Sequence, residues 1–377
     1  MEIHGHCDER FGGVRRAFES NFAELDDVGA SVAATLDGEP IVDLWAGTCS
    51  TDAGHDRAWE EDTIINVWST TKTMSFIVIL MLADRGQLDL DAPIADVWPE
   101  FAANGKDRVT TAHVLSHAAG LSGWDTLTTV DDLTDHDLVS ARLAAQAPWW
   151  EPSTASGYHA ITQGYLLGEI VRRVDGRTLG RFLADEVTGP LGADFHIGTP
   201  AEHDARVAHV VPPPDALGAD LEPGTIADRT FATAPLDAAA SSTVAWRRAE
   251  IPAAGGHGNA RSVARVMSLL ANGGAVDGRR FLSPEACDRI FDEQQHGIDL
   301  VLGRLMRLGL GFGLPHDEMP LPNERTCYWG GWGGSLALAD LDGRLSFSYV
   351  MNDMRSSTTG DDRSGRLLMA LYGSPAD

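Results

Sequence analysis

The sequence predicts an α/β (α+β) fold, with an antiparallel sheet built from both ends of the chain, flanking helices and an inserted, mostly helical lobe. Three observations predict it. Strand patterns gather at the two ends of the 377-residue chain, helical patterns fill its middle, and the length exceeds what one core usually supports. We therefore expect one lobe from residues 1–86 and 255–377, a helical lobe from 87–254, and a functional site between them.

The N-terminal elements are a helix, a hairpin, a short strand and a second helix. Apolar residues at helical spacing predict the first helix, and Asp37-Gly38 between two apolar runs is typical of a tight hairpin. Gly86 suits the residue just after a helix end. In order, the predicted elements are a helix over Phe11 to Phe22, strands over Ala30 to Leu36, Ile41 to Trp45 and Thr63 to Val67, and a helix from Ser69 to Arg85.

The middle of the chain is helical and rich in loops, and strands return near the C-terminus. Five prolines between Pro200 and Pro223 predict a long irregular excursion over the surface, and Asp342-Gly343 predicts a second hairpin. The predicted helices are Thr111 to His117, Ser140 to Ala145, Ala160 to Val174, Leu179 to Glu186, Arg261 to Ala271 and Asp361 to Leu371. The predicted strands are Ser335 to Asp340 and Arg344 to Met351.

Composition excludes several classes of partner. With 55 acidic against 29 basic residues the formal charge is −26, which disfavours binding to nucleic acid or to anionic membranes. The longest apolar run, Phe76 to Ala83, is far shorter than the roughly 20 residues that span a bilayer. Met1 to Arg10 contains no apolar signal segment, and the four cysteines form no C-x-x-C pair, so we expect a cytoplasmic protein.

Lysine is the rarest of the basic residues, and one of the two lysines lies in a motif that carries chemistry. Ser69-Thr70-Thr71-Lys72 is an S-x-x-K element at the start of an apolar helix, where the spacing puts Ser69 and Lys72 on one face. A serine hydroxyl needs a base, and a desolvated lysine supplies one, whereas arginine stays protonated. We predict that Ser69 is a nucleophile and Lys72 its base.

Two further segments are candidates for the same site. Tyr158 precedes a helix and can share a proton relay with Lys72, although a buried structural tyrosine is the alternative. Trp329-Gly330-Gly331-Trp332-Gly333-Gly334-Ser335 holds four glycines in seven residues, which predicts close approach of the backbone and N–H groups free to bind an oxyanion. The alternative is a bulge or tight turn with two packing tryptophans.

Other catalytic and metal motifs are missing from the sequence. It contains no G-x-S-x-G, H-E-x-x-H, P-loop or G-x-G-x-x-G pattern, so we expect no metal and no organic cofactor. His113 and His117 lie four residues apart without a neighbouring Glu, which favours structural roles. His4, His6 and Cys7 are expected to lie in a flexible terminus.

These elements, in this order, resemble the serine β-lactamase and penicillin-binding superfamily, and most closely the family VIII carboxylesterases, which share the class C β-lactamase fold. The resemblance covers nearly the whole chain. It rests on 66–72, on the helical-lobe segments 88–94, 114–121 and 189–192, and on the glycine-rich segment. It implies a β-lactamase/transpeptidase-like fold, with Ser69 as nucleophile, Lys72 and Tyr158 as bases, and the N–H groups of Ser69 and Trp332 as oxyanion donors.

Two departures from β-lactamases indicate the substrate. Ala160 stands where β-lactamases have Asn, and Trp329-Gly330-Gly331 replaces their Lys-Thr-Gly, as in the esterase branch. The lost side chains help to hold a lactam, so the resemblance implies weak β-lactamase activity at most. Four tryptophans, Trp149, Trp150, Trp329 and Trp332, suggest an aromatic acyl pocket.

The predicted function is hydrolysis of small carboxylic esters through an acyl-enzyme on Ser69. The alternatives are an acyltransferase of the same fold that acts on a natural-product alcohol or amine, and a non-catalytic binding protein that retains the fold. The partner is a small-molecule ester. The sequence leaves the native ester and the oligomeric state open.

Overall fold

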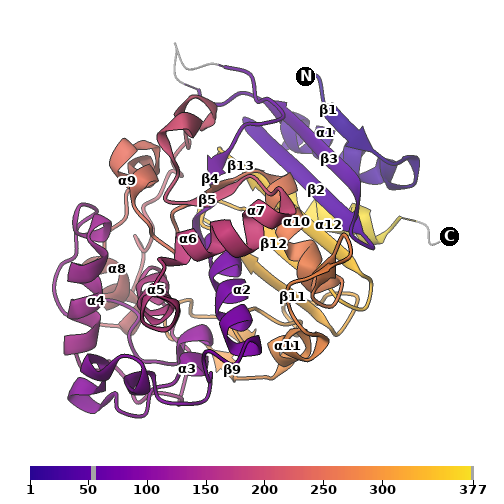
Figure 1. Ribbon diagram of the computed structural model, residues 1–377. Helices are drawn as coiled ribbons and strands as arrows, with labels where there is room; N and C mark the ends of the chain where they lie inside the picture. The colour runs from indigo at the N-terminus through magenta and orange to yellow at the C-terminus, as the bar shows by residue number, and fades with distance from the viewer. Residues whose placement is uncertain (52–56, 375–377) are drawn as a thin grey trace.

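The computed structural model describes residues 1–51 and 57–374. Its main feature is a six-stranded antiparallel sheet that joins the two ends of the chain, with strand order β1-β3-β2-β13-β12-β11 (Figure 1). The strands in that order are β1 (His4–Cys7), β3 (Glu39–Gly47), β2 (Gly29–Leu36), β13 (Leu345–Met351), β12 (Leu336–Asp340) and β11 (Thr326–Gly330). The predicted antiparallel sheet with flanking helices is confirmed.

Helices cover both faces of this sheet. Every residue of β11, β12 and β13 is therefore buried, whichever face its side chain points to. Ser346 of β13 donates its hydroxyl proton to the Ala264 carbonyl of α10 (Ala260–Ala271), which packs across β2, β12 and β13. Tyr349, three residues on and so on the opposite face, lies under Arg363 of α12 (Asp362–Tyr372). Helix α12 packs in turn against α1 (Gly12–Glu24).

Helix α2 (Thr71–Asp84) is the central helix of the molecule, and twelve of its fourteen residues are buried. A helix that is apolar all round must be surrounded by packed elements, and α2 contacts α5, α6 and α11. The other helices are α3 (Thr111–Leu115), α4 (His136–Ala145), α5 (Thr162–Asp175), α6 (Leu179–Leu183), α7 (Gly189–Leu191), α8 (Ile226–Thr233), α9 (Val244–Arg248) and α11 (Pro284–Asp288). No helix in the described part of the chain is long and apolar enough to cross a membrane.

Three smaller sheets complete the strands. The one that matters for the site has the order β4-β6-β5, so β6 pairs with two strands that both precede it in the sequence. These strands are β4 (Ile65–Asn66), β6 (Gly256–Gly258) and β5 (Phe195–Ile197). The two hairpins are β7 (Ala275–Val276) with β8 (Arg279–Arg280), and β9 (Gln295–Ile298) with β10 (Leu305–Leu308). The division into lobes at residues 86 and 255 stays a prediction.

Several sequence predictions need correction. The expected flexible terminus is β1, whose His4 to Cys7 pair in register with β3. The helix predicted to reach Glu186 ends at Leu183 and continues as a wider π-type turn over Ala184–Thr188. The strand predicted over Thr63 to Val67 is shorter in the structure, Ile65–Asn66, because the chain turns at Val67 to enter the next helix.

Candidate active site

Ser69 lies at a strained entry into α2. The chain leaves β4 and makes a single 3₁₀ turn, Trp68–Thr70, before α2 begins. Trp68 has a φ of +48°, a conformation that costs a non-glycine residue about 1–3 kcal/mol. The Trp68 ring is held between those of Trp246 and Trp332, at centroid distances of 5.4 and 4.8 Å. This packing fixes the turn that carries the serine.

Lys72 lies one helical turn after Ser69 and is 1% exposed. Its Nζ is 3.0 Å from Ser69 Oγ and 3.1 Å from the Tyr158 hydroxyl. It is also 2.7 Å from the Ala160 carbonyl and 3.0 Å from the Ala253 carbonyl. Among the described residues no carboxylate raises the pKa of Lys72, and burial lowers that pKa well below its ordinary value.

The four oxygens around Lys72 Nζ fit a neutral amine. An ammonium group has three protons to donate, whereas a neutral amine has two protons and a lone pair. The two carbonyls can only accept, so they take both protons of the amine. The lone pair is then left for the Ser69 hydroxyl, which is the proton donor a base requires, while the Tyr158 hydroxyl donates its own proton to Ser69 Oγ.

Tyr158 completes a triangle of polar atoms. Its hydroxyl donates to Ser69 Oγ over 2.5 Å, and its backbone N–H donates to Asp299 Oδ1 over 2.9 Å. Burial raises the pKa of Tyr158 above its ordinary value, so the side chain keeps its proton at neutral pH. Tyr158 therefore acts on Ser69 as a hydrogen-bond donor, and it can pass a proton between Ser69 and Lys72.

The glycine-rich segment forms the turn between β11 and β12, directly beside Ser69. A Cβ on Gly331 would lie 2.3 Å from the Val67 carbonyl oxygen and 3.3 Å from the Ser69 backbone nitrogen, so only glycine allows this approach. Ser335 Oγ lies 2.9 Å from Thr70 Oγ1 and also donates to the Val67 carbonyl. These contacts hold the turn against Ser69.

Two backbone N–H groups at this junction are free. The N–H groups of Gly331 and Gly334 donate within the turn, and that of Gly333 donates to the Ser357 carbonyl. Within residues 1–51 and 57–374, the N–H groups of Ser69 and Trp332 have no hydrogen-bond acceptor. Unused donors beside a hydroxyl nucleophile can bind the oxyanion of a tetrahedral intermediate.

A small apolar pocket opens onto Ser69. It has a volume of about 20 Å³, and no charged side chain lines it. Its walls are Trp68, Tyr158, Ala160, Ile161, Leu217, Phe231, Leu236, Ala254, Trp332 and Thr358. The predicted surface excursion therefore supplies a wall, because Leu217 belongs to it. Larger hollows, of about 290 and 580 Å³, are lined by other residues that do not include Ser69.

Of the four tryptophans expected in the pocket, only Trp332 lines it. Trp329 is buried behind Tyr158, with its ring 5.3 Å from the His117 ring and 5.9 Å from the Tyr158 ring. Trp149 donates its indole N–H to Asp125, and Trp150 donates to the Ala155 carbonyl, so both lie outside the pocket. Three of the four tryptophans therefore pack around the site and do not line the pocket.

Histidines near the site have structural partners. His159 Nδ1 lies 2.6 Å from the Gly157 carbonyl, and Nε2 accepts the Leu121 N–H, while burial lowers the pKa of His159 to about 3. His113 completes the capping box of α3, and His117 Nδ1 accepts the His159 N–H. Across the described ranges, no three His, Cys, Asp or Glu side chains are grouped to hold a metal ion.

Sequence reasoning missed several residues that shape the site. Trp68 and Ser335 lay inside the motifs that were noticed, but nothing in the sequence signals a left-handed Trp68 or the contact of Ser335 with Thr70. Asp299 accepts the N–H groups of Tyr158, Val301 and Leu302, a role that depends on a contact 141 residues away in sequence. Phe231 and Leu236 had no signal beyond their apolar character.

Comparison with known proteins places the chain among its relatives. The model of the Beta-lactamase family matches residues 18–371. The chain is 36% identical to the esterase/beta-lactamase LipL of Mycobacterium tuberculosis, over 96% of this chain and 86% of that protein. The structure is similar to that of a family VIII carboxylesterase, with a TM-score of 0.92 and 42% identity over all of both chains.

A penicillin-binding protein homologue from Caulobacter crescentus is also similar, with a TM-score of 0.90 and 39% identity over all of both chains. The resemblance recognised in the sequence is thus confirmed at the level of the family. Because the family model covers nearly the whole chain and the fold agrees with it throughout, this protein belongs to the beta-lactamase family.

Proposed function

We propose that the chain is a serine carboxylesterase that hydrolyses small carboxylic esters through an acyl-enzyme on Ser69. The observation that carries the proposal is the Ser69–Lys72–Tyr158 triangle, in which every pair of polar atoms is within 3.1 Å. Similarity to LipL and to a family VIII carboxylesterase supports ester chemistry in particular.

Acylation follows from the contacts around Ser69. Neutral Lys72 takes the Ser69 proton, directly or through the Tyr158 hydroxyl, and the serine oxygen attacks the ester carbonyl carbon. The N–H groups of Ser69 and Trp332 bind the resulting oxyanion. As the tetrahedral intermediate collapses, the bond to the alkoxy group breaks, and the proton held by Lys72 passes to that leaving oxygen to release the alcohol.

Deacylation repeats these steps with water as the nucleophile. Lys72 and Tyr158 take a proton from water, the hydroxide attacks the acyl carbon, and the proton returns to Ser69 as the acid leaves. An acyltransferase would differ only in the second nucleophile, which would be an alcohol or amine in place of water. Adding such an acceptor to the same assay and measuring the transfer product tests this alternative. The cytoplasmic location and independence from cofactors stay predictions from the sequence.

The experiment is turnover of a short-chain aryl ester by Ser69→Ala. We expect the rate to fall by roughly 10⁴-fold or more, with an unchanged circular-dichroism spectrum. Ser75→Ala is the matched control, because Ser75 is also a buried serine, in α2, but its hydroxyl donates to the Pro252 carbonyl and not to the Ser69–Lys72–Tyr158 triangle. Turnover that persists in Ser69→Ala at the level of Ser75→Ala would refute the proposal.

A further inference from the structure

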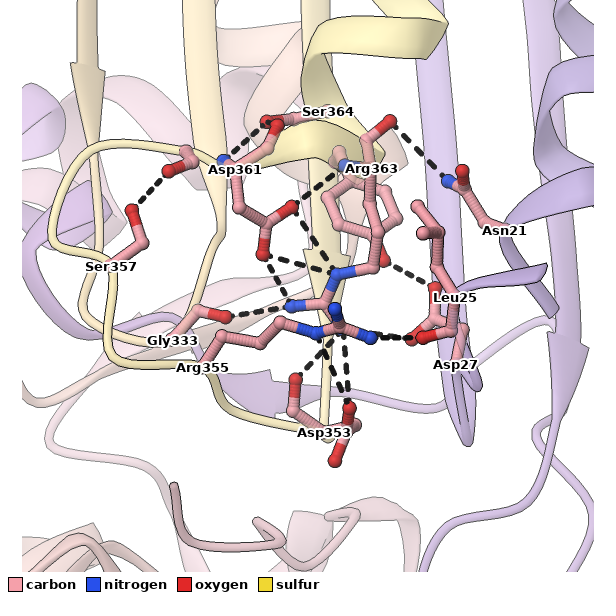
Figure 2. A network of polar contacts seen from close by, with 12 residues as sticks. Asn21, Leu25, Asp27, Gly333, Asp353, Arg355, Ser357, Asp361, Arg363 and Ser364 are labelled. Carbon is pink, nitrogen blue, oxygen red and sulfur yellow. Dashed lines mark hydrogen bonds and ion pairs between the residues drawn. The ribbon is translucent and has the colours of Figure 1, made fainter. Parts of the chain in front are cut away.

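Arg363 is the centre of a buried charged cluster, shown in Figure 2, that the chemistry above does not use. Its side chain is fully buried in the first turn of α12. Nη1 donates to Asp27 Oδ1 over 3.1 Å and to the Asp353 carbonyl over 2.9 Å. Nη2 donates to Asp361 Oδ2 over 2.6 Å, and Nε also contacts the Asp361 carboxylate. The Asp27 carboxylate in turn accepts the Tyr349 hydroxyl.

One contact of this cluster leads to the glycine turn of the active site. Arg363 Nη2 donates to the Gly333 carbonyl over 2.8 Å. The Arg355 backbone N–H also donates to that carbonyl, over 3.1 Å, and the Gly333 N–H donates to the Ser357 carbonyl over 2.8 Å. The residue directly before Gly333 is Trp332, whose N–H is one of the two free donors beside Ser69.

These contacts hold the side of the turn that faces away from Ser69. Gly333 and Gly334 have φ values of +101° and +122°, a conformation that favours glycine, and neither residue has a side chain that could pack against a neighbour. A Cβ on Gly334 would lie 2.2 Å from Asp361 Oδ2 and 2.8 Å from Arg363 Nη2, so the charged cluster packs directly against the backbone of the turn. Ser335 fixes the turn from the side of the nucleophile, and Arg363 fixes it from the opposite side.

Stability alone does not account for such a cluster. Burying an ion pair costs desolvation that its attraction barely repays, and apolar side chains of similar volume often stabilise a fold at least as well. A guanidinium, by contrast, has five donors in one plane and can fix several oxygens in one geometry. Here those oxygens belong to Asp27 before β2, to Asp353 after β13, to Asp361 at the start of α12 and to the catalytic turn.

We propose that Arg363 is a positioning residue for ester hydrolysis: by holding the Gly333 carbonyl it sets the direction of the Trp332 N–H toward the oxyanion. The inference rests on the proposed function. It adds a residue that touches neither substrate nor Ser69 and acts only through the backbone of the turn. Arg363 should therefore affect the stabilisation of the oxyanion more than the binding of the ester.

The test compares an aryl ester with the matching thionoester, in which sulfur replaces the carbonyl oxygen. Sulfur is larger and accepts hydrogen bonds weakly, so the thionoester gains little from the two N–H donors, although both substrates need Ser69 and Lys72. A general loosening of the site lowers both rates by the same factor. Displacement of the Trp332 N–H lowers the ester rate selectively.

For Arg363→Lys we expect kcat for the ester to fall at least tenfold, with KM within about twofold of wild type and a ratio of ester to thionoester rates at least fivefold lower. Lysine keeps the charge among the acidic residues but cannot reach Asp27 and Gly333 together. Arg355→Lys is the matched control, because the Arg355 side chain contacts Leu25 and Asp353 while only its backbone contacts Gly333. It should keep the wild-type ratio.

If Arg363→Lys does not fold, the double variant Asp27→Asn/Arg363→Gln removes one charge of each sign, leaves the net charge unchanged and carries the same expectation. A folded variant of either kind with the wild-type ratio overturns the role of Arg363. That result leaves the proposed function intact, because Ser69→Ala tests it separately. A wild-type protein with no preference for the ester over the thionoester also overturns the inference, since there would be no oxyanion donor to position.

Discussion

Lys72→Arg is the substitution that separates a base from a mere positive charge. If Lys72 only attracts the oxyanion, arginine, a permanent cation, should preserve much of the activity. If Lys72 takes the Ser69 proton, arginine should fail, because guanidinium stays protonated across the usable pH range. Since no carboxylate pairs with Lys72 and two carbonyls already take its protons, we predict the second outcome.

The magnitude follows from the loss of general-base assistance, which typically contributes 10²- to 10⁴-fold, and we expect a decrease of about that size for acylation. Arginine should also lower the free energy of unfolding by several kcal/mol, because it places a permanent, larger cation where lysine is 1% exposed. Lys72→Met is the neutral comparison. It leaves the Ala160 and Ala253 carbonyls without donors, at about 1–3 kcal/mol each.

The assay is the single-turnover burst of an aryl ester, which isolates acylation, run on variants whose circular dichroism matches that of wild type. Deacylation is measured separately from the steady state, because Tyr158 can contribute differently to the two steps. We expect Arg and Met variants to be almost equally slow in the burst. A folded Lys72→Arg protein within tenfold of wild type, with Lys72→Met much slower, would remove Lys72 from the proton relay.

The remaining predictions concern pH, stability and substrate. Because the pKa of Lys72 is lowered and that of Tyr158 raised, kcat/KM should rise with pH and level off well below pH 10, without a decline below that pH; a rate still climbing tenfold per unit above pH 9 contradicts this. Burial raises the pKa of Asp27 from 3.8 to about 6, so the folded chain holds this proton more tightly than the unfolded chain does. The stability that Asp27 contributes is therefore complete below about pH 4 and lost as pH rises through 6. The unfolding free energy of wild type minus that of Asp27→Asn should fall by up to about 3 kcal/mol from pH 4 to 7 in denaturant titrations, and a flat difference contradicts the shift. Finally, a short-chain aryl ester should be hydrolysed far faster than a chromogenic cephalosporin, since Ala160 and Trp329 replace side chains that hold a lactam; equal rates would show that these departures do not set the substrate.

Much of the fold followed from local signals in the sequence. Asp37 and Gly38 have φ values of +54° and +87°, the left-handed conformations that an Asp-Gly hairpin requires, and β2 and β3 pair around them as predicted. Gly86, with a φ of +69°, follows the end of α2. By contrast β1 has an exposed, polar sequence and exists because its backbone pairs with β3, which no local pattern records.

The candidate site likewise has one part that the sequence predicts and one part that only the structure shows. The spacing of Ser69 and Lys72 along one helix was readable, because helical geometry fixes the contact between residues three apart. The contacts of Lys72 with Tyr158 and with the carbonyls of Ala160 and Ala253 join segments 86 to 181 residues apart and required the structure. The position of Tyr158 before a helix made it a candidate and the family resemblance implied its role, whereas the tryptophan-rich segments misdirected the predicted pocket toward Trp149 and Trp150.

The most direct test of the central claim is capture of the acyl-enzyme. An aryl ester mixed with the enzyme and quenched in acid during the burst should yield protein heavier by the mass of one acyl group. Digestion should locate that mass on the peptide that contains Ser69, and Ser69→Ala should show no increase. An acyl group on another residue, or none on an enzyme that turns over the ester at full rate, would contradict a mechanism through Ser69.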